Sequence, residues 1–485
     1  MTAAELEAVL ARRPVPGHPR AYQFPAFERS TLPNGLQILT VNVPGRPLVT
    51  AELVVRFGAT DEPAEEGGAT VLAARALSEG TEHYDAIALV EAAERLGASL
   101  HAEASWDAFA ASVEVPADRL AASLELLAEM ALRPTFPGPE VDRLRDERLN
   151  DLLQARADPR RRAEEVFVAT AYPGESPYHR PAGGLRETVE RLGPDGLRSL
   201  HRRLLDPSRA AIVVGGDLAG LDVAAIAGRL FGDLAAPGDP TAPLVVDDRS
   251  AVERTFVRLV DRPGSVQSEI RIGHKGVPRK VADFHATQMM AAILGGLFNS
   301  RLNRKLREEK GYTYGAHAGF DMRRAAGPFV ARAAVDTANT APAIVETLTE
   351  LRRIREAPVE PDELAAARDF LVGVFPLRFE TPGAVVGALS GLFVQELPDD
   401  ELARYRGAIE AVDSEAVRAA ADGHLDPDRL AIVVVGDADA TAAAIEKAGV
   451  GPLEIVREEP GAEAGSQAGP RPPGLPASTA ETFDG

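Results

Sequence analysis

The sequence predicts an α+β protein made of two tandem homologous domains, each with an antiparallel-rich sheet packed against helices. Three observations support this. The chain has 485 residues, one of its segments recurs, and strand-like and helix-like segments follow in the same order in both halves. By length alone the chain fits about three domains, give or take one, and it is too long for one ordinary hydrophobic core.

The recurring segment occupies 205–217 and 425–437. The first copy reads L-D-P-S-R-A-A-I-V-V-G-G-D and the second L-D-P-D-R-L-A-I-V-V-V-G-D, so that ten of thirteen positions are identical at an offset of 220 residues. Each copy predicts a turn, then a buried strand, then a Gly-Asp exit from the strand. Self-similarity at this spacing indicates that one domain has been duplicated.

Other segments correspond more loosely between the two halves. Strands are expected at 49–57 and 268–273, and again at 105–115 and 327–335. Long helices are expected at 117–132 and 341–355, and helices that begin with Pro and an acid at 139–155 and 361–375. Each half is therefore expected to form one sheet with helices against it.

Composition shifts set the expected boundaries, which are an N-terminal extension at 1–30, a first domain at 31–234, a linker at 235–250, a second domain at 251–456 and a disordered tail at 457–485. The linker is rich in Pro and Asp, and the tail in Gly, Pro and small residues. Such compositions bury too little apolar surface to fold by themselves.

Composition also excludes several functions. Cysteine is absent, which excludes disulfides, thiolate metal sites and cysteine nucleophiles. The net charge is −20 and basic clusters are short, so we expect no nucleic-acid partner. The N-terminus has acids where an export signal needs cations, and no apolar run reaches membrane-spanning length. We therefore expect a cytoplasmic protein with no membrane partner.

The segment 300–320, S-R-L-N-R-K-L-R-E-E-K-G-Y-T-Y-G-A-H-A-G-F, carries the first candidate site. Ser300 fits a helix N-cap, and Lys310 with Gly311 a helix stop. Alternation at 312–320 predicts a strand that returns beside this helix. Arg307 and Tyr314 are thus expected to point at one place, where a guanidinium and a phenol can hold a peptide backbone. The alternatives are an Arg307 paired with local acids and a Tyr314 buried as a core aromatic.

A second segment, 58–81, reads G-A-T-D-E-P-A-E-E-G-G-A-T-V-L-A-A-R-A-L-S-E-G-T. Together with the repeat, the linker and R-E-x-K-G-x-x-Y in the second half, it resembles the pitrilysin or insulinase family of inverted zincins, in the short, processing-peptidase-like branch. The resemblance covers roughly residues 32–439. Family members carry H-x-x-E-H here, which supplies two zinc ligands and the general base.

The resemblance places the zinc-motif positions of this chain at Val71, Ala74 and Arg75. Val71 and Ala74 have no donor atom, and Arg75 is a permanent cation that repels a metal ion, so the motif is degenerate. The third ligand of the family falls near Asn150 or Asp151, and Asp151 retains a carboxylate for weak coordination. A salt bridge is expected to fill the space around Arg75.

No histidine pair replaces the motif, because no two of the nine histidines lie closer than eleven positions. We therefore expect no metal on this chain, although a zinc site built from distant histidines stays open as a minor alternative.

In the family, residues matching Arg307 and Tyr314 hold the substrate backbone next to zinc, and some members divide these tasks between two chains. The resemblance thus implies a non-catalytic, substrate-binding subunit of a heterodimeric zinc metallopeptidase, with zinc on a homologous partner that has an intact H-x-x-E-H motif. It implies no activity for this chain alone and a peptide held as an added strand, in the first half near 98–105. The alternatives are a zinc-free structural or assembly protein and a self-sufficient metallopeptidase, which the emptied motif disfavours.

Overall fold

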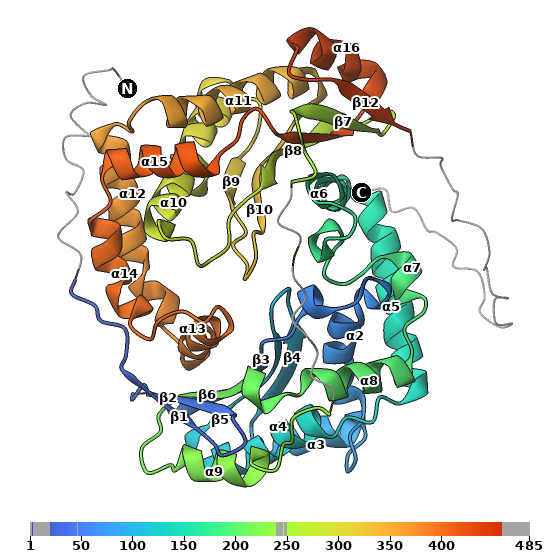
Figure 1. The fold of residues 1–485 in the computed structure, drawn as a ribbon, viewed down its shortest axis with the longest axis vertical. Coiled ribbons are helices and arrows are strands. Elements are labelled where there is room, and N and C mark those ends of the chain that lie inside the picture. Colours follow the sequence, from blue (N-terminus) through green and yellow to red (C-terminus); the bar gives the residue numbers. More distant parts are fainter. Residues whose placement is uncertain (1, 3–19, 46, 239–245, 247–249, 458–485) are drawn as a thin grey trace, which may run out of the picture.

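Figure 1 shows a computed structural model of the chain, in which two six-stranded sheets are flanked by helices. The structure describes residues 2, 20–45, 47–238, 246 and 250–457. Much of the predicted linker at 235–250 and nearly all of the predicted tail at 457–485 lie outside these residues, so the domain boundaries stay a prediction. The predicted α+β class with two similar units is confirmed, because each sheet is mostly antiparallel and packs against helices.

The first sheet has the strand order β1-β2-β6-β3-β5-β4. Its strands are β1 (Phe27–Thr31), β2 (Gln37–Asn42), β3 (Leu48–Val55), β4 (Ser99–Ala104), β5 (Phe109–Pro116) and β6 (Ala210–Gly216). β6 pairs in parallel with β2 and antiparallel with β3. β4 lies at an edge of this sheet, within the stretch 98–105 where a bound peptide is expected to add as a strand, and its residues alternate between exposed and half-buried.

The second sheet repeats this plan in the order β12-β7-β11-β8-β10-β9. Its strands are β7 (Phe256–Asp261), β8 (Gln267–Lys275), β9 (Ala316–Phe320), β10 (Pro328–Asp336), β11 (Ala431–Gly436) and β12 (Leu453–Val456). The strands of the sequence repeat are β6 and β11, which are buried along their whole length and occupy the same place in the two sheets. The predicted duplication is therefore visible in the topology.

Helices fill the connections between the strands. Those of the first half are α2 (Ala69–Ala76), α3 (Ala86–Arg95), α4 (Leu120–Leu132), α5 (Gly138–Ala157), α6 (Pro159–Ala171), α7 (Arg186–Val189), α8 (Pro194–Leu204) and α9 (Val223–Phe231). Those of the second half are α10 (Phe284–Ala291), α11 (Thr340–Glu356), α12 (Pro361–Val374), α13 (Pro382–Val394), α14 (Glu401–Glu410), α15 (Ser414–His424) and α16 (Ala438–Ala448). The four predicted long helices correspond to α4, α5, α11 and α12.

One helix from each half packs on the sheet of the other half. On α13, Val385 and Leu389 join a core cluster with Val213 of the first sheet. On α6, Phe167 joins a cluster with Val433 of the second sheet. Figure 1 shows α13 and α6 between the two sheets. Fully burying one such side chain stabilises the folded protein by about 1.5–3 kcal/mol. Apolar contacts made by these two helices therefore hold the two halves together.

A hairpin tip adds a polar contact between the halves. Between β9 and β10, the Arg323 guanidinium lies 4.2 Å from the ring centre of Trp106 in the first half. The backbone N–H of the next residue, Arg324, donates to the Asp107 carboxylate over 2.8 Å. Trp106 is the single tryptophan of the chain, and it therefore reports on this contact.

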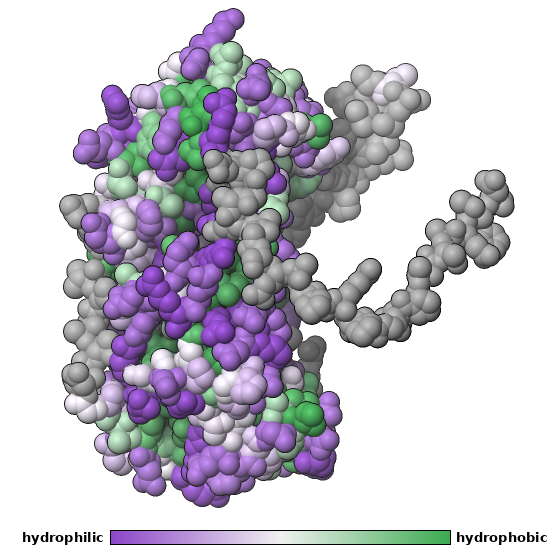
Figure 2. Space-filling model, turned by 90° about the vertical axis from the view of Figure 1, so that its right-hand side faces the viewer, coloured by the Kyte–Doolittle hydropathy of each residue, from purple (hydrophilic) through white to green (hydrophobic). Residues whose placement is uncertain are grey.

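The described helices include none that is long and apolar enough to cross a bilayer. The face drawn in Figure 2 is a mosaic of hydrophilic and hydrophobic residues.

Candidate functional site

Helix α2 carries the three positions that the resemblance assigns to a zinc motif. It is short and rich in alanine, and it begins after Gly68, whose φ of +96° favours glycine. Val71 is half-buried, Ala74 is buried and Arg75 is exposed. Two of these side chains contain no donor atom, and the third donates to Glu147 on α5 over 2.8 Å. The expected salt bridge of Arg75 is therefore confirmed.

The facing helix α5 holds the carboxylates of this region. Glu147 also accepts from Arg143 over 2.6 Å, so two guanidinium groups contact it. Asp151, one turn later, accepts from Arg161 over 2.8 and 3.0 Å and also from Arg148. The hydrogen bonds from Arg161 lower the pKa of Asp151, as does the charge of Arg148. Arginines thus occupy the carboxylates that a metal ion would need.

These residues do not fit a zinc ion. Zinc in proteins takes three or four ligands from Cys, His, Asp and Glu. Within the described part of the chain, no group of three such residues is placed to hold a metal. Sequence reasoning missed Glu147, although its place four residues before Asp151, on the same face of a helix, was a usable signal.

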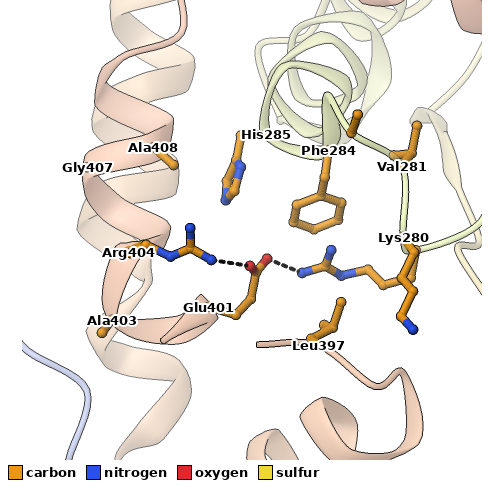
Figure 3. A pocket seen from close by; sticks show the side chains of 12 residues that line it. Lys280, Val281, Phe284, His285, Leu397, Glu401, Ala403, Arg404, Gly407 and Ala408 are labelled. Atoms are coloured by element: carbon orange, nitrogen blue, oxygen red, sulfur yellow. Dashed lines mark hydrogen bonds and ion pairs between the residues drawn. The ribbon is translucent and has the colours of Figure 1, made fainter. Parts of the chain in front are cut away.

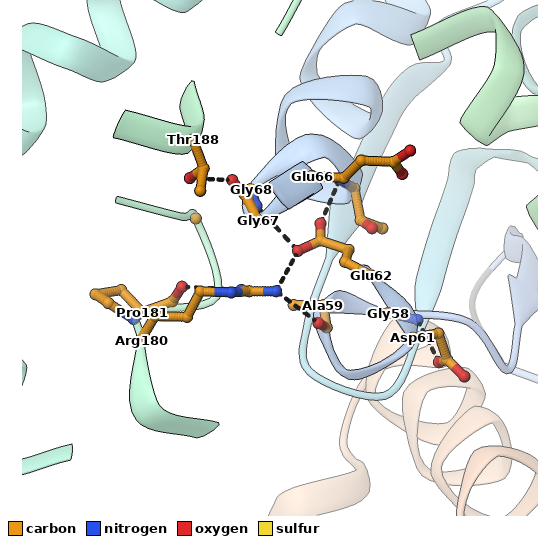
Figure 4. A network of polar contacts seen from close by, with 12 residues as sticks. Gly58, Ala59, Asp61, Glu62, Glu66, Gly67, Gly68, Arg180, Pro181 and Thr188 are labelled. Carbon is orange, nitrogen blue, oxygen red and sulfur yellow. Dashed lines mark hydrogen bonds and ion pairs between the residues drawn. The ribbon is translucent and has the colours of Figure 1, made fainter. Parts of the chain in front are cut away.

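A buried polar network nonetheless holds α2 in place (Figure 4). The Glu62 carboxylate accepts from the backbone N–H groups of Gly68, over 2.9 Å, and Thr70, over 2.6 Å, at the start of α2. It also pairs with Arg180 over 2.9 Å, and both side chains are nearly fully buried. Burial raises the pKa of Glu62, and the charge of Arg180 opposes that rise.

The glycines beside this network leave no room for other residues. A Cβ atom on Gly68 would lie 2.7 Å from the carbonyl oxygen of Gly183, and one on Gly184 would lie 2.2 Å from that of Gly67. Such distances force the backbone to shift, so glycine is required at these close approaches. Closely packed backbone therefore surrounds the start of α2, although the zinc-motif positions of this helix carry no metal ligand.

Arg307 lies on a short π-helix, η8 (Asn303–Glu309), in the second half. Leu302 and Leu306 are buried, and the Ser300 carbonyl accepts the N–H of Arg304 over 2.9 Å. Gly311 ends the segment with a φ of +66°.

The guanidinium of Arg307 lies over an aromatic ring. Its central carbon is 4.4 Å from the ring centre of Phe298, which is 69% exposed. Its ion pair with Glu308 is long, at 3.5 Å. A guanidinium stacked on a ring in this way keeps its N–H edge available for carbonyl or carboxylate oxygens.

Tyr314 lies elsewhere than the sequence predicted. The strand expected at 312–320 begins only at Ala316, and Tyr314 lies in the preceding turn with 94% of its surface exposed. The Thr313 hydroxyl donates to the Gly315 carbonyl over 2.9 Å and accepts its N–H over 3.1 Å, which holds this turn out of the sheet. The alternative of a core aromatic is therefore wrong.

No hydrogen bond or ring contact joins Arg307 to Tyr314 in the described residues, so their common role stays a prediction. Asn303, which sequence reasoning missed, connects the segments that carry them. Its side-chain amide donates to Leu297 beside Phe298 over 3.2 Å, and its oxygen accepts from Ala316, the first residue of β9, over 2.8 Å.

The fold and the site define a class: a peptidase-like α+β protein with two similar halves and an emptied zinc helix. Residues 37–181 match the family model described as insulinase, peptidase family M16, and residues 191–371 match the one described as the peptidase M16 inactive domain. The chain belongs to this family. With the missing metal ligands, these matches support a non-catalytic member.

Relatives and solved structures agree with this assignment. An uncharacterized zinc protease of Streptomyces coelicolor is 25% identical over 81% of this chain and 86% of its own length. A non-peptidase homolog of Helicobacter pylori is 22% identical over 73% of this chain and 80% of its own. A crystal structure of a peptidase M16 inactive domain from Pseudomonas fluorescens, 24% identical, covers 85% of this chain and 98% of that one with a TM-score of 0.79, which shows the common fold.

Proposed function

We propose that this chain is the non-catalytic, substrate-binding subunit of a heterodimeric zinc metallopeptidase that cleaves peptides in an enclosed chamber. The observation that carries the proposal is a contrast between the halves. In the first half, the buried polar network that holds α2 in place is present, but the zinc-motif positions of this helix hold Val71, Ala74 and Arg75. In the second half, Arg307 has a half-buried side chain whose guanidinium makes only one long ion pair in the described residues.

In this proposal a homologous partner with an intact H-x-x-E-H motif carries the zinc and performs the cleavage. Arg307 grips a carbonyl oxygen of the bound peptide near the scissile bond, because its N–H edge is free for an acceptor. The exposed Tyr314 hydroxyl donates to the oxyanion as negative charge develops there. The peptide adds as a strand to an open sheet edge, for which the exposed, alternating β4 is suited.

The test is a peptidase assay on the chain reconstituted with its partner, which co-purification with a tagged chain identifies. Loss of one oxyanion donor commonly costs on the order of 3 kcal/mol, so we expect Tyr314→Phe and Arg307→Ala each to lower turnover about 100-fold. Matched controls are Arg304→Ala, an exposed arginine on the same π-helix, and Tyr312→Phe. Both should stay near the original rate. If both test variants remain within about twofold of it, the proposed role of the pair is wrong.

A zinc-free structural or assembly protein is the second candidate. The observation that favours it is the set of arginine–carboxylate pairs around Arg75 and Asp151, which occupies the zinc-motif region and forms without any substrate. An adjacent gene for a similar chain with an intact H-x-x-E-H motif supports the peptidase subunit. Its absence, together with unchanged turnover in the Arg307 and Tyr314 variants, supports the structural role.

A further inference from the structure

The hairpin tip at 321–327, between β9 and β10, contacts the first half of the protein. In Figure 1, β9 and β10 extend from the second sheet toward the first. A Cβ atom on Gly327 would lie 1.9 Å from the carbonyl oxygen of Asp321, so the close approach inside this tip requires glycine. Because the tip lies outside α6 and α13, the helices that pack across the halves, it needs its own explanation.

The side chain of Arg323 packs against two aromatic rings of the first half. Its guanidinium carbon lies 4.2 Å from the ring centre of Trp106 and 4.4 Å from that of Tyr178. The two ring centres are 5.2 Å apart, and the Arg323 side chain is only 7% exposed. Its carboxylate partner, Asp321 at 2.9 Å, belongs to the tip itself. The first half therefore holds Arg323 by ring faces, which attract a desolvated guanidinium strongly.

The backbone of Arg323 is anchored in the second half. Its carbonyl oxygen accepts the N–H of Arg279 over 2.8 Å. The Arg279 guanidinium is held by Glu401 on α14, over 2.7 Å, and by the ring of Phe284 on α10, whose centre is 3.3 Å away. Figure 3 shows Glu401 and Phe284 close together, where both line one cavity. Arg323 is thus fixed to the second half by its main chain and to the first half by its side chain.

The other residues of the tip add polar contacts to the first half. The side chain of Arg324 lies 3.5 Å from the buried Asp61 carboxylate. The hydroxyl of Tyr172 donates to the carbonyl oxygen of Ala326 over 3.1 Å. Together with the bond from the Arg324 N–H to Asp107, these contacts reach three separate segments of the first half. The tip is therefore held in one position.

These contacts lie between the two parts of the proposed peptide-binding site. On one side, β4 ends two residues before Trp106. On the other side, β9 ends at Phe320, next to the tip, and begins two residues after Tyr314. Both strands lie at sheet edges, and β9 pairs only with β10 among the described strands. The tip is therefore a short connection between the edge of β4 and the segment that carries Arg307 and Tyr314.

We propose that Arg323 is a positioning residue for the proposed peptidase site. Docked on Trp106 and Tyr178, it holds β9 so that Arg307 and Tyr314 keep their place relative to a peptide bound at β4. This role rests on the proposed function, because Arg323 acts only through the two residues that contact the peptide. A misplacement of about 1 Å can lower an enzymatic rate about 100-fold, so loss of this anchor should affect the reaction.

The first test measures the position of β9 without any activity. The chain has no cysteine, so spin labels can be attached after His101→Cys on β4 and His317→Cys on β9, both at exposed positions. Electron spin resonance should give one narrow distribution of distances between the labels. Arg323→Ala should broaden or shift this distribution, and the matched control Arg353→Ala, at an exposed position of α11, should leave it unchanged. The same distribution with and without Arg323 would overturn the proposal.

The second test measures turnover by the complex with the zinc-bearing partner. Arg323→Ala should lower kcat about tenfold or more and change KM less than about threefold, since β4 still binds the peptide. In a chain that already carries Tyr314→Phe, the same change should lower kcat about threefold or less, because it acts partly through that hydroxyl. A purely structural role would lower kcat by the same factor in both backgrounds. Arg323→Lys keeps the charge and should restore part of kcat, and it replaces the alanine variant in both tests if that variant does not fold.

These measurements separate the positioning role from the proposed function. If Arg307→Ala and Tyr314→Phe lower turnover but the Arg323 variants do not, the positioning role is wrong and the proposed function stands. If the Arg307 and Tyr314 variants leave turnover unchanged, the proposed function fails and the positioning role fails with it.

Discussion

The buried pair of Glu62 and Arg180 offers the sharpest test of how the first half is built. Replacing Arg180 with Met removes its bond to Glu62 and a second bond, of 3.3 Å, to the Ala59 carbonyl. A charge-assisted bond is worth about 1.5–3 kcal/mol and a stranded buried acceptor costs about 1–3 kcal/mol. We therefore expect a loss of about 3–5 kcal/mol in the free energy of unfolding, the range for breaking a buried ion pair from one side.

The loss should depend on pH with a definite sign. Burial already raises the pKa of Glu62, and removing Arg180 removes the largest influence that lowers it. In the variant, an ionised Glu62 is therefore penalised at high pH, and protonation relieves the penalty as the pH falls through the raised folded-state pKa. The loss should be largest near pH 8 and smaller near pH 5.5. The double variant Glu62→Gln/Arg180→Met should recover part of the stability, because no buried charge remains.

Urea denaturation followed by the fluorescence of Trp106 measures these losses, since this single tryptophan packs 5.2 Å from Tyr178, close to Arg180. The control is Arg75→Met, whose ion pair with Glu147 is exposed on both sides and should matter little. The reasoning is refuted if Arg180→Met costs no more than Arg75→Met, or if its cost is the same at both pH values.

Two further variants probe the connection between the halves. Leu389→Ala, at a fully buried position of α13, should lower the free energy of unfolding measured by urea denaturation by about 2–5 kcal/mol. Leu377→Ala, at an exposed position, should leave this free energy nearly unchanged. Arg323→Ala removes the guanidinium from the Trp106 ring and should shift the tryptophan emission, which Arg353→Ala, at an exposed position of α11, should leave unchanged. Unchanged stability for Leu389→Ala, or unchanged emission for Arg323→Ala, would contradict the packing described.

The repeat made much of the fold predictable. Two copies of one segment identified β6 and β11, and the loosely corresponding segments around them located the strands β3, β5, β8 and β10 and the helices α4, α5, α11 and α12. The sequence did not allow us to predict that α6 and α13 each pack on the sheet of the other half. An apolar helix face shows that a helix is buried, but it does not say which sheet covers it, and both sheets offer similar apolar surfaces.

The sequence predicted which residues occupy the candidate site better than it predicted where their side chains lie. The absence of metal ligands at Val71 and Ala74 followed from the family resemblance, which places the zinc motif there, together with side chains that have no donor atom. The position of Tyr314 did not, because the alternating pattern of 312–320 fits a strand while the Thr313 hydroxyl holds a turn instead. Local side-chain bonds of this kind compete with sheet pairing and leave no trace in hydrophobic periodicity.

The central claim is that this chain holds peptides and leaves their cleavage to a partner. The most direct measurement compares peptide hydrolysis by the purified chain, first treated with a chelator and then loaded with zinc, with hydrolysis by the same chain after its partner is added. The account predicts no turnover and no stoichiometric zinc for the chain alone, and turnover with the partner that falls when Arg307 is replaced. Stoichiometric zinc together with peptide hydrolysis at enzymatic rates by the chain alone would contradict it.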